Sequence, residues 1–294
     1  MIPDLKIIIV NWNLKQDTIA CLESLLQAGA VPDHIILVDN GSQDGTIEAI
    51  ISHFPEKFQY IKNEENLGFV IGSNQGISLA LQQGAKWILL LNNDTIVAPD
   101  FMEQLAAAQI QGKQYSVLSP LIFSFDQPDR IWFSGDFLIP GTLITRNPYK
   151  GKKISKEMPD LLPTDFASGC AMLVHSPVFE QVGLLNPSLI MYGEEVDFCW
   201  RARQLGYKIA CSTKATIWHK VSTSAKKDQP NSRYLKSRNQ IRFYRNYSKG
   251  IQIPIMFLFS IIKSFQLVIY DLFHNQSELI PVTAKAWLDG WRGL

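Results

Sequence analysis

Four short apolar runs near the start of this chain constrain its fold more than any other feature. Helix-like segments separate them, so strand and helix patterns alternate. The runs cover residues 6–10, 34–39, 58–62 and 86–91, and the helix-like segments cover residues 17–28, 45–54, 70–83 and 99–111. Continuous apolar runs are typical of buried parallel strands, and their alternation with helices indicates right-handed βαβ units. The sequence therefore predicts an α/β domain whose mixed, mainly parallel sheet has helices on both faces.

Each apolar run ends in a cluster of Asn or Asp residues. The clusters lie at residues 11–13, 39–42, 63–68 and 92–94. Asn, Asp and Gly are also ordinary turn residues, so a single ending of this kind would indicate only a turn. Parallel strands end at the same edge of a sheet, and ligands of such sheets bind at that edge. Four polar endings on one edge therefore favour a polar binding site.

The composition excludes several classes of protein. The 28 basic and 27 acidic side chains leave a net charge of +1, whereas a domain that binds nucleic acid through its overall charge is strongly basic. With 46% hydrophobic and 19% charged residues, the chain has the composition of a globular protein. The glycine motifs of NAD-dependent dehydrogenases and P-loop NTPases are absent, as are the HExxH of zincins and the GxSxG of α/β-hydrolases.

The cysteines and the N-terminal segment favour a cytoplasmic protein. The four cysteines show no CxxC spacing and are expected to be reduced and buried. The first apolar run is too short for the core of a signal peptide, so we interpret the four Asn-x-Ser/Thr matches as chance.

Asn92, Asn93 and Asp94 form a candidate site for a divalent cation. Mg²⁺ and Mn²⁺ prefer oxygen ligands and are often held by one or two carboxylates together with substrate phosphates. Asp94 is the best ligand of the three, and the two asparagines can donate or accept hydrogen bonds. His219, at the end of a later apolar run, could complete the site, although a single histidine in that place is usually structural. The alternative for the triplet is a capped turn before the helix predicted from Pro99.

Three acids, Glu194, Glu195 and Asp197, open a helix predicted over residues 193–206. Acids in a first turn complement the helix dipole, and Asp197 with Arg201 has the i,i+4 spacing of an ion pair. Glu194 and Asp197 share a face, whereas Glu195 lies about 100° around the axis. Glu195 therefore has no evident structural partner, and we predict that it accepts a proton from a reacting hydroxyl.

The C-terminal part of the chain has a different character, so we divide the chain into residues 1–225 and a helical extension, residues 226–294. Residues 226–249 contain eight Lys or Arg and one acid, and helices are predicted over residues 232–247, 254–273 and 281–291. The middle helix is marginal as a membrane span because Pro254, Lys263, Gln266 and Asp271 interrupt it. Two interpretations remain: the extension docks on anionic lipid, or it packs as a cap on the first domain.

Taken together, these segments resemble the family-2 glycosyltransferases of GT-A (Rossmann-like) fold, and especially their bacterial rhamnosyltransferase-like branch. The resemblance covers roughly residues 6 to 220 in order. The matching segments are residues 8–13, 38–45, 66–69, 72–76, 91–95, 168–171, 191–197 and 218–219.

The resemblance implies transfer of a sugar from a nucleotide-diphosphate donor, linked to dTDP or UDP, to an acceptor hydroxyl with inversion at the anomeric carbon. It implies that the base and ribose are held by Asn11, Asn13 and Asp39, and that Gly68 and Asn74 line the donor pocket. Asn92, Asn93 and Asp94 stand where the family carries its Asp-x-Asp motif, with Asn92 replacing the first aspartate. Asp94 and His219 are then ligands of Mg²⁺ or Mn²⁺, and Glu195 is the general base at the second position of the family's Glu-Asp motif.

The resemblance also implies partners and a place in the cell. The acceptor is a glycan or a lipid-linked molecule in polysaccharide or cell-surface glycan assembly, and rhamnose on dTDP is the favoured donor. The protein is expected in the cytoplasm or bound to an anionic surface on the cytoplasmic face of a membrane. One alternative is a non-catalytic nucleotide-sugar-binding or membrane-scaffold protein on the same fold. Another is a nucleotidyltransferase, which needs a glycine-rich, basic phosphate loop that residues 11–15 do not provide.

Overall fold

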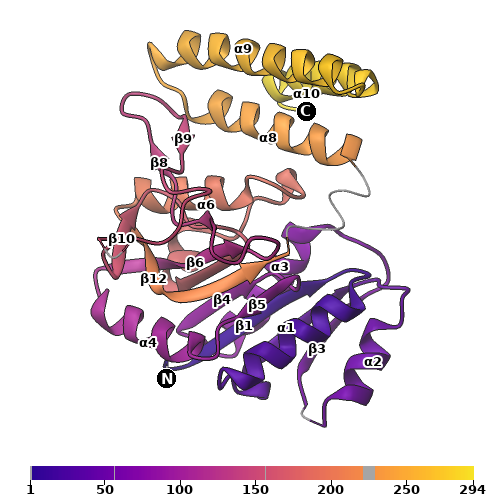
Figure 1. Cartoon of the computed structure of the whole chain (residues 1–294), viewed down its shortest axis with the longest axis vertical. Coiled ribbons are helices and arrows are strands. Elements are labelled where there is room, and N and C mark those ends of the chain that lie inside the picture. Colours follow the sequence, from indigo (N-terminus) through magenta and orange to yellow (C-terminus); the bar gives the residue numbers. More distant parts are fainter. Residues whose placement is uncertain (1, 56, 156, 221–228) are drawn as a thin grey trace.

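The computed structural model describes residues 2–55, 57–155, 157–220 and 229–294. Figure 1 shows a twisted sheet with helices on both sides and a further layer of helices above it. The helices are α1 (Lys15–Gln27), α2 (Thr46–His53), α3 (Phe69–Gln82), α4 (Phe101–Gln111), α5 (Ser176–Val182), α6 (Glu194–Gln204), α8 (Gln229–Tyr247), α9 (Gln252–Phe273) and α10 (Ile280–Arg292). Short 3₁₀ turns cover Pro32–His34, Pro187–Leu189 and Ser277–Leu279.

The main sheet is mixed, as the sequence predicts, and its strand order is β10-β12-β6-β11-β4-β1-β2-β3. Its strands are β1 (Leu5–Asn11), β2 (Ile35–Asn40), β3 (Gln59–Asn63), β4 (Trp87–Leu91), β5 (Thr95–Val97), β6 (Tyr115–Ser124), β7 (Ile131–Phe133), β10 (Leu161–Thr164), β11 (Ala171–His175) and β12 (Lys208–His219). Strands β8 (Phe137–Leu138) and β9 (Thr145–Arg146) form a separate hairpin. Strands β1 to β4 pair in parallel, and β11 runs antiparallel between β4 and β6.

The register of the parallel strands brings their polar endings to one edge. Asn11 of β1 lies opposite Asp39 of β2, and Asn40 of β2 lies opposite Asn63 of β3. The chain continues from the end of β4 into Asn92 at the same edge. The polar clusters predicted from the sequence therefore do lie next to one another.

Two hydrophobic cores cover the two faces of the sheet. Side chains alternate across a strand, so Ile7 and Ile9 pack with α1, α2 and α4, whereas Ile8 packs with α3, α5 and α6. Gly76 allows α3 to approach β1, because a Cβ at this position would lie 2.5 Å from the Cγ2 atom of Ile8.

The second half of the sheet is more regular than the sequence predicts. Residues 115–164 have little periodicity and several Gly and Pro residues, a pattern that predicts irregular strands and a loop, yet β6 is a regular ten-residue strand within this segment. The sequence pattern likewise predicts a strand over residues 208–211 and a second short run that ends at His219, whereas β12 is one strand of 12 residues with a shift in register between Ser212 and Thr216. Both strands owe their length to pairing with each other, and that pairing joins segments about ninety residues apart, which local periodicity does not report.

The C-terminal extension forms the three predicted helices, α8 to α10 (Figure 1). Helix α8 packs on α6 through Trp200, Phe243 and Tyr247, whose rings contact one another. A bidentate ion pair joins Arg233 of α8 to the fully buried Asp271 of α9, with both N–O distances at 3.0 Å. The predicted boundary between residues 225 and 226 lies outside the described residues.

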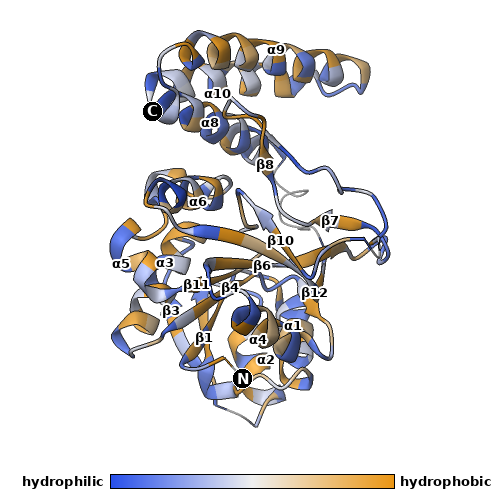
Figure 2. Cartoon of the chain, turned by 90° about the vertical axis from the view of Figure 1, so that its left-hand side faces the viewer, coloured by the Kyte–Doolittle hydropathy of each residue, from blue (hydrophilic) through white to orange (hydrophobic). Residues whose placement is uncertain are grey.

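Helix α9 exposes an apolar surface. Its length and composition would allow it to cross a membrane, and only 11% of its most apolar stretch is buried inside the protein. Figure 2 shows the hydrophobic colouring along α9 at the end of the molecule farthest from the N-terminus. The extension therefore holds α8 against the sheet domain and presents α9 outward.

Candidate active site

The buried side chain of Asn11 joins three strand ends. Its amide nitrogen donates to Asp39 Oδ1 and to Ser42 Oγ, both at 2.9 Å. Its oxygen accepts hydrogen bonds from Thr18 Oγ1 at 2.7 Å and from Asn93 Nδ2 at 2.9 Å. An amide has two N–H donors and two acceptor lone pairs, so all of its hydrogen-bonding capacity is used inside the protein. Asn11 and Asn93 therefore shape this edge of the sheet from within.

Asp39 and Asn13 lie beside this group. Asp39 Oδ2 accepts from the backbone N–H of Ser42 at 3.1 Å, and Asn13 Oδ1 accepts from the N–H of Gln43 at 2.7 Å. The backbone N–H of Asn13 donates to Ser42 Oγ at 3.0 Å. A carboxylate offers about four acceptor positions, and the hydrogen bonds from Asn11 and Ser42 use two of those of Asp39. Asp39 is buried and keeps acceptor capacity for a further donor.

A second group of hydrogen bonds ties β2, β3 and α3 together. Asn63 Nδ2 donates to Asn40 Oδ1 at 2.7 Å and to Gln75 Oε1 at 2.8 Å, and Asn40 Nδ2 donates to the Gly68 carbonyl at 3.0 Å. Gly68 adopts φ +87°, and a Cβ there would lie 3.1 Å from Ile190 Cγ2. Gly68 is thus placed where the chain that opens α3 meets the loop before α6.

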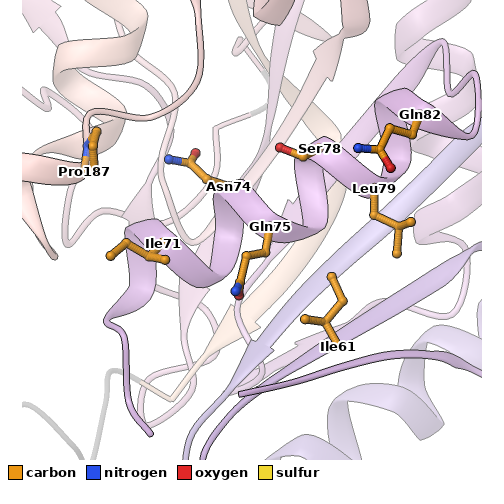
Figure 3. A pocket seen from close by; sticks show the side chains of 8 residues that line it. All are labelled: Ile61, Ile71, Asn74, Gln75, Ser78, Leu79, Gln82 and Pro187. Atoms are coloured by element: carbon orange, nitrogen blue, oxygen red, sulfur yellow. The ribbon is translucent and has the colours of Figure 1, made fainter. Parts of the chain in front are cut away.

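Asn74 holds a loop. Its amide donates to the Leu185 carbonyl at 2.8 Å and accepts from the Leu185 N–H at 3.1 Å. Asn74 also borders a surface groove of about 520 Å³ that runs along α3 between Ile61 and Pro187 (Figure 3). The side chains that line this groove do not include Asp39, Asp94 or Glu195, so the groove is separate from the polar edge.

Asp94 and His219 meet although 125 positions separate them in the sequence. Strand β5 pairs antiparallel with the end of β12, so Thr95 lies opposite His219. The Nε2 atom of His219 consequently lies 3.1 Å from Asp94 Oδ1, with both side chains buried. Trp132 of β7 contacts the His219 ring edge-on, at 4.7 Å between the ring centres.

The groups around Asp94 fit a divalent cation. Asp94 supplies a carboxylate, His219 an imidazole, and the buried Asn92 Oδ1 has no hydrogen-bond partner among the described residues. Oxygen donors with one imidazole suit Mn²⁺ or Mg²⁺. No group of three or more His, Cys, Asp or Glu that could hold a metal occurs in the described part of the chain. A cation at this place would therefore need further ligands from a bound substrate or from water.

The charge state of His219 is linked to such a cation. Burial disfavours the imidazolium, but the Cys170 sulfur and the Asp94 carboxylate outweigh this effect and raise the pKa of His219 to about 10. A metal ligand must be a neutral imidazole, so binding of a cation would release this proton.

The segment from Ser168 to Cys170 brings the acidic helix to the same place. The Cys170 carbonyl accepts from the N–H of Asn92 at 2.8 Å, at the strand end that leads to Asp94. Next to it, a Cβ on Gly169 would lie 3.3 Å from Glu194 Oε1 and 3.5 Å from Glu195 Cβ. The absence of a side chain at Gly169 allows this close approach. The predicted acids and the predicted metal ligands thus flank one three-residue segment.

The three acids of α6 have different surroundings. Asp197 accepts from Arg201 Nε at 2.8 Å and from the Tyr247 hydroxyl at 2.6 Å, which confirms the predicted structural pair. Glu194 is buried, and its Oε2 atom has no hydrogen-bond partner among the described residues. The geometry therefore gives Asp197 a structural role, whereas one carboxyl oxygen of Glu194 stays without a hydrogen bond in the described part of the chain.

Burial raises the pKa of both glutamates. The pKa of Glu194 is well above its ordinary range because the carboxyl is buried and Glu195 lies beside it. The pKa of Glu195 is raised first by burial and then by the negative charge of Asp136. Two neighbouring carboxyls of this kind hold a proton into a higher pH range than exposed glutamates do.

Several residues of the site were not predicted from the sequence. Thr18 and Trp132 join it through contacts with Asn11 and His219, and the charge of Asp136 acts on Glu195. None of the three belongs to a motif, and Trp132 and Asp136 are far in the sequence from the residues that they affect. Cys170 was predicted only to be reduced and buried, and it is indeed a free, buried cysteine.

Comparison with known proteins identifies relatives along most of the chain. A family model described as "Glycosyl transferase family 2" matches residues 6–183. The low-salt glycan biosynthesis hexosyltransferase of Haloferax volcanii is 30% identical, and the match covers 99% of this chain and 92% of that protein. The N-acetylglucosaminyl-diphospho-decaprenol L-rhamnosyltransferase of Mycobacterium tuberculosis is 27% identical over 70% of this chain and 73% of its own length.

A solved structure shows the same fold. The mannosyltransferase of Pyrobaculum calidifontis, in complex with GDP-Man and Mn²⁺, superposes with a TM-score of 0.59 at 10% identity. The superposition covers 99% of this chain and 87% of that protein. This likeness confirms the predicted GT-A fold with its C-terminal helices.

The raised pKa of Glu194 predicts that Glu194→Gln stabilises the protein at neutral pH. A carboxyl whose pKa is higher in the folded state binds more protons there, so its unfavourable contribution grows as pH rises through the folded-state pKa. We expect the melting temperature at pH 7 to rise by about 2–4 °C, and the gain to vanish near pH 4, below the ordinary glutamate pKa. Thermal unfolding followed by circular dichroism measures both values.

Asp197→Asn on the same helix is the matched control for this experiment. It weakens the contacts to Arg201 and Tyr247, so we expect it to lower the melting temperature at pH 7. A Glu194→Gln variant that is destabilised to the same extent at pH 7 would contradict the raised pKa.

Proposed function

The chain belongs to glycosyl transferase family 2, and from this premise we propose that it transfers a hexose from a nucleotide-diphosphate donor to an acceptor hydroxyl with inversion of the anomeric carbon. The proposal is carried by the Ser168–Cys170 segment, which contacts both the strand end that leads to the Asp94–His219 pair and the start of the helix that carries Glu195. A site for the leaving diphosphate and a base for the incoming hydroxyl are both needed, and this arrangement offers them on one strand edge.

Asp39 and Asn13 bind the nucleoside of the donor. The remaining acceptor positions of the Asp39 carboxylate suit the N–H of a pyrimidine base, and the hydrogen bonds from Asn11 and Ser42 hold that carboxylate in place. A buried acceptor that loses its donor costs roughly 1–3 kcal/mol, so this contact selects for a base with an N–H at the matching position. Gly68 and Asn74 act less directly, by fixing the loops that meet α3.

Mg²⁺ or Mn²⁺ would be held by Asp94, His219 and Asn92. Asn93 would orient the segment from residue 92 to 94 through its hydrogen bond to Asn11. The cation would neutralise the negative charge that develops on the leaving diphosphate. The bound Mn²⁺ of the similar mannosyltransferase supports a divalent cation in this fold.

Glu195 is the general base. The acceptor hydroxyl attacks the anomeric carbon from the face opposite the diphosphate, and the Glu195 carboxylate takes the hydroxyl proton as the new bond forms. One displacement of this kind inverts the anomeric carbon and requires no covalent sugar–protein intermediate. Burial raises the pKa of Glu195, and a raised pKa brings the base closer to the operating pH, where general-base catalysis is most efficient.

The donor is dTDP-rhamnose or another dTDP- or UDP-linked sugar, and the acceptor is a glycan or a lipid-linked molecule in glycan assembly. Similarity to a rhamnosyltransferase whose named acceptor is a diphospho-decaprenol supports this choice. Similarity to a glycan biosynthesis hexosyltransferase along nearly the whole chain supports the wider class.

The extension places the protein on the cytoplasmic face of an anionic membrane. The outer side of α9 exposes Leu258, Phe265 and Phe273, among other apolar side chains. Residues 229–294 contain nine Lys or Arg and three acids, which favours a negatively charged surface. A helix with an apolar face and basic surroundings lies in the plane of the interface rather than across it.

Turnover of a nucleotide-sugar panel tests the proposed activity and the base together. We expect the wild-type protein to hydrolyse or transfer from one dTDP- or UDP-linked sugar, and Glu195→Gln to lower kcat by roughly 10²–10⁴-fold with nearly unchanged donor affinity. Released nucleotide measures kcat, and calorimetry measures affinity. The matched controls are Glu194→Gln and Asp197→Asn, and a dead, folded control beside an active Glu195→Gln would reassign the base.

Dependence on a divalent cation provides a separate test. We expect activity to require Mg²⁺ or Mn²⁺, to fall steeply in Asp94→Ala, and to fall less in His219→Ala, because the carboxylate carries the charge that holds the cation. Activity is measured before and after chelation and after each metal is restored, with thermal unfolding as the check on folding. Full turnover in excess chelator would show that the site works without a metal.

Vesicle binding tests the role of α9. We expect the full chain to sediment with vesicles of anionic phospholipid, less so at high salt, and the paired change Leu258→Ser with Phe265→Ser to reduce the bound fraction several-fold. Ile51→Ser is the matched control, because Ile51 of α2 is 61% exposed and Phe265 is 63% exposed. Equal loss of binding in the control, or no loss in the α9 variant, would favour a helix that only caps the fold.

A further inference from the structure

The loop that leads into α6 has an unusual backbone conformation. Ile190 adopts φ +66° and ψ −58°, and the N–H of Met191 donates to the Leu189 carbonyl at 2.7 Å across it. This is a γ-turn with positive φ, a rare and strained conformation, and it is particularly unfavourable for a β-branched residue. Tyr192 also has a positive φ, at +69°, directly before Gly193 opens the helix. A chain does not keep such a loop without support from its surroundings.

Side chains of α8 supply that support, and Asn239 makes the largest share of the contacts. Asn239 Nδ2 lies 2.9 Å from the carbonyl of Leu189, 2.8 Å from that of Met191 and 2.7 Å from that of Tyr192. Its Oδ1 atom accepts from Arg238 Nε at 3.0 Å, which sets the orientation of the amide. Asn239 is 3% exposed, so water does not compete for these bonds. The amide nitrogen therefore lies within hydrogen-bond distance of three carbonyl groups of the strained loop.

The loop is also held from its other sides. Arg242 donates to the carbonyl and to the hydroxyl of Ser188 at 3.0 and 3.1 Å. Across the loop, the N–H of Val70 donates to the Ile190 carbonyl at 3.1 Å, next to Gly68. The loop thus connects the start of α3, at the donor side of the site, with the C-terminal extension.

We propose that Asn239 is a positioning residue for catalysis, which holds the loop from Leu189 to Tyr192 so that Glu195 enters α6 at a fixed place beside Gly169. The proposal rests on the proposed role of Glu195 as the base. Strained backbone that is held by its surroundings is typical of functional sites. This role of Asn239 would make the C-terminal extension part of the catalytic site, in addition to the membrane contact proposed for α9.

Asn239→Ala tests this positioning role in the full-length protein. We expect kcat to fall by about 10–10²-fold while the donor KM changes by less than about threefold, because a base displaced by ~1 Å loses rate rather than donor binding. Asn246→Ala is the matched control, since Asn246 is an exposed asparagine on the same helix. Unchanged kcat in a folded Asn239→Ala variant would overturn the proposal.

Amide hydrogen exchange gives a readout that does not need activity. We expect the amides from residue 189 to 195 to exchange at least about tenfold faster in Asn239→Ala than in Asn246→Ala, with the rest of α6 unchanged. Unaltered exchange in this loop would show that Asn239 does not hold it, even if no donor sugar has been found. Should Asn239→Ala fail to fold, Arg242→Ala removes only the bonds to Ser188, and we expect a several-fold lower kcat and faster exchange in the same loop.

Measuring Glu195→Gln in parallel separates the general-base role of Glu195 from the positioning role of Asn239. An inactive Glu195→Gln beside a fully active Asn239→Ala would leave the base assignment intact and refute the positioning role. A fully active Glu195→Gln would refute the role of Glu195 as general base and, with it, the catalytic role proposed for Asn239.

Discussion

The hydrogen bonds of the buried Asn11 amide are the constraint on which the polar edge of the sheet depends. Polar groups that leave water must find partners, and Asn11 provides them at the ends of β1, β2 and β4 at once. Because these groups satisfy one another, few polar atoms remain for a ligand. Among the described residues, those atoms include the spare acceptor positions of Asp39, the Asn92 oxygen, the Asp94 and His219 side chains, and the carboxyls that flank Gly169. The site is thus defined as much by the groups that are used internally as by those that are not.

The acids beside Gly169 illustrate the conflict between stability and chemistry. Asp197 is paired with Arg201 and Tyr247 and supports α6, whereas Glu194 is buried and the charge of the neighbouring Glu195 raises its cost of ionisation. A sequence selected for stability alone would not place two such carboxyls together. Their presence near the Ser168–Cys170 segment fits the proposed reaction, which needs a base near a charged leaving group.

The C-terminal extension has an inner side that contacts the sheet domain and an outer side that is exposed. Its inner helix, α8, contacts α6 through aromatic rings and reaches the loop before Glu195 through Asn239, while its outer helix, α9, exposes apolar side chains. The Arg233–Asp271 ion pair links the two helices. A surface that binds α9 would therefore be only one helix away from the loop proposed to position Glu195.

The sequence by itself determined the parallel strands, their polar edge and the pairing of Asp197 with Arg201, because strand periodicity, the common direction of βαβ strands and i,i+4 spacing are local properties. Only the tertiary structure decided the rest. It joined β6 to β12, placed Asp94 beside His219, committed Asn74 to Leu185 and Asn93 to Asn11, and brought Asn239 to the loop before α6. Each of these contacts joins residues that are distant in the chain, and hydrogen-bond partners at such separations are set by how the layers pack, which no local pattern reports.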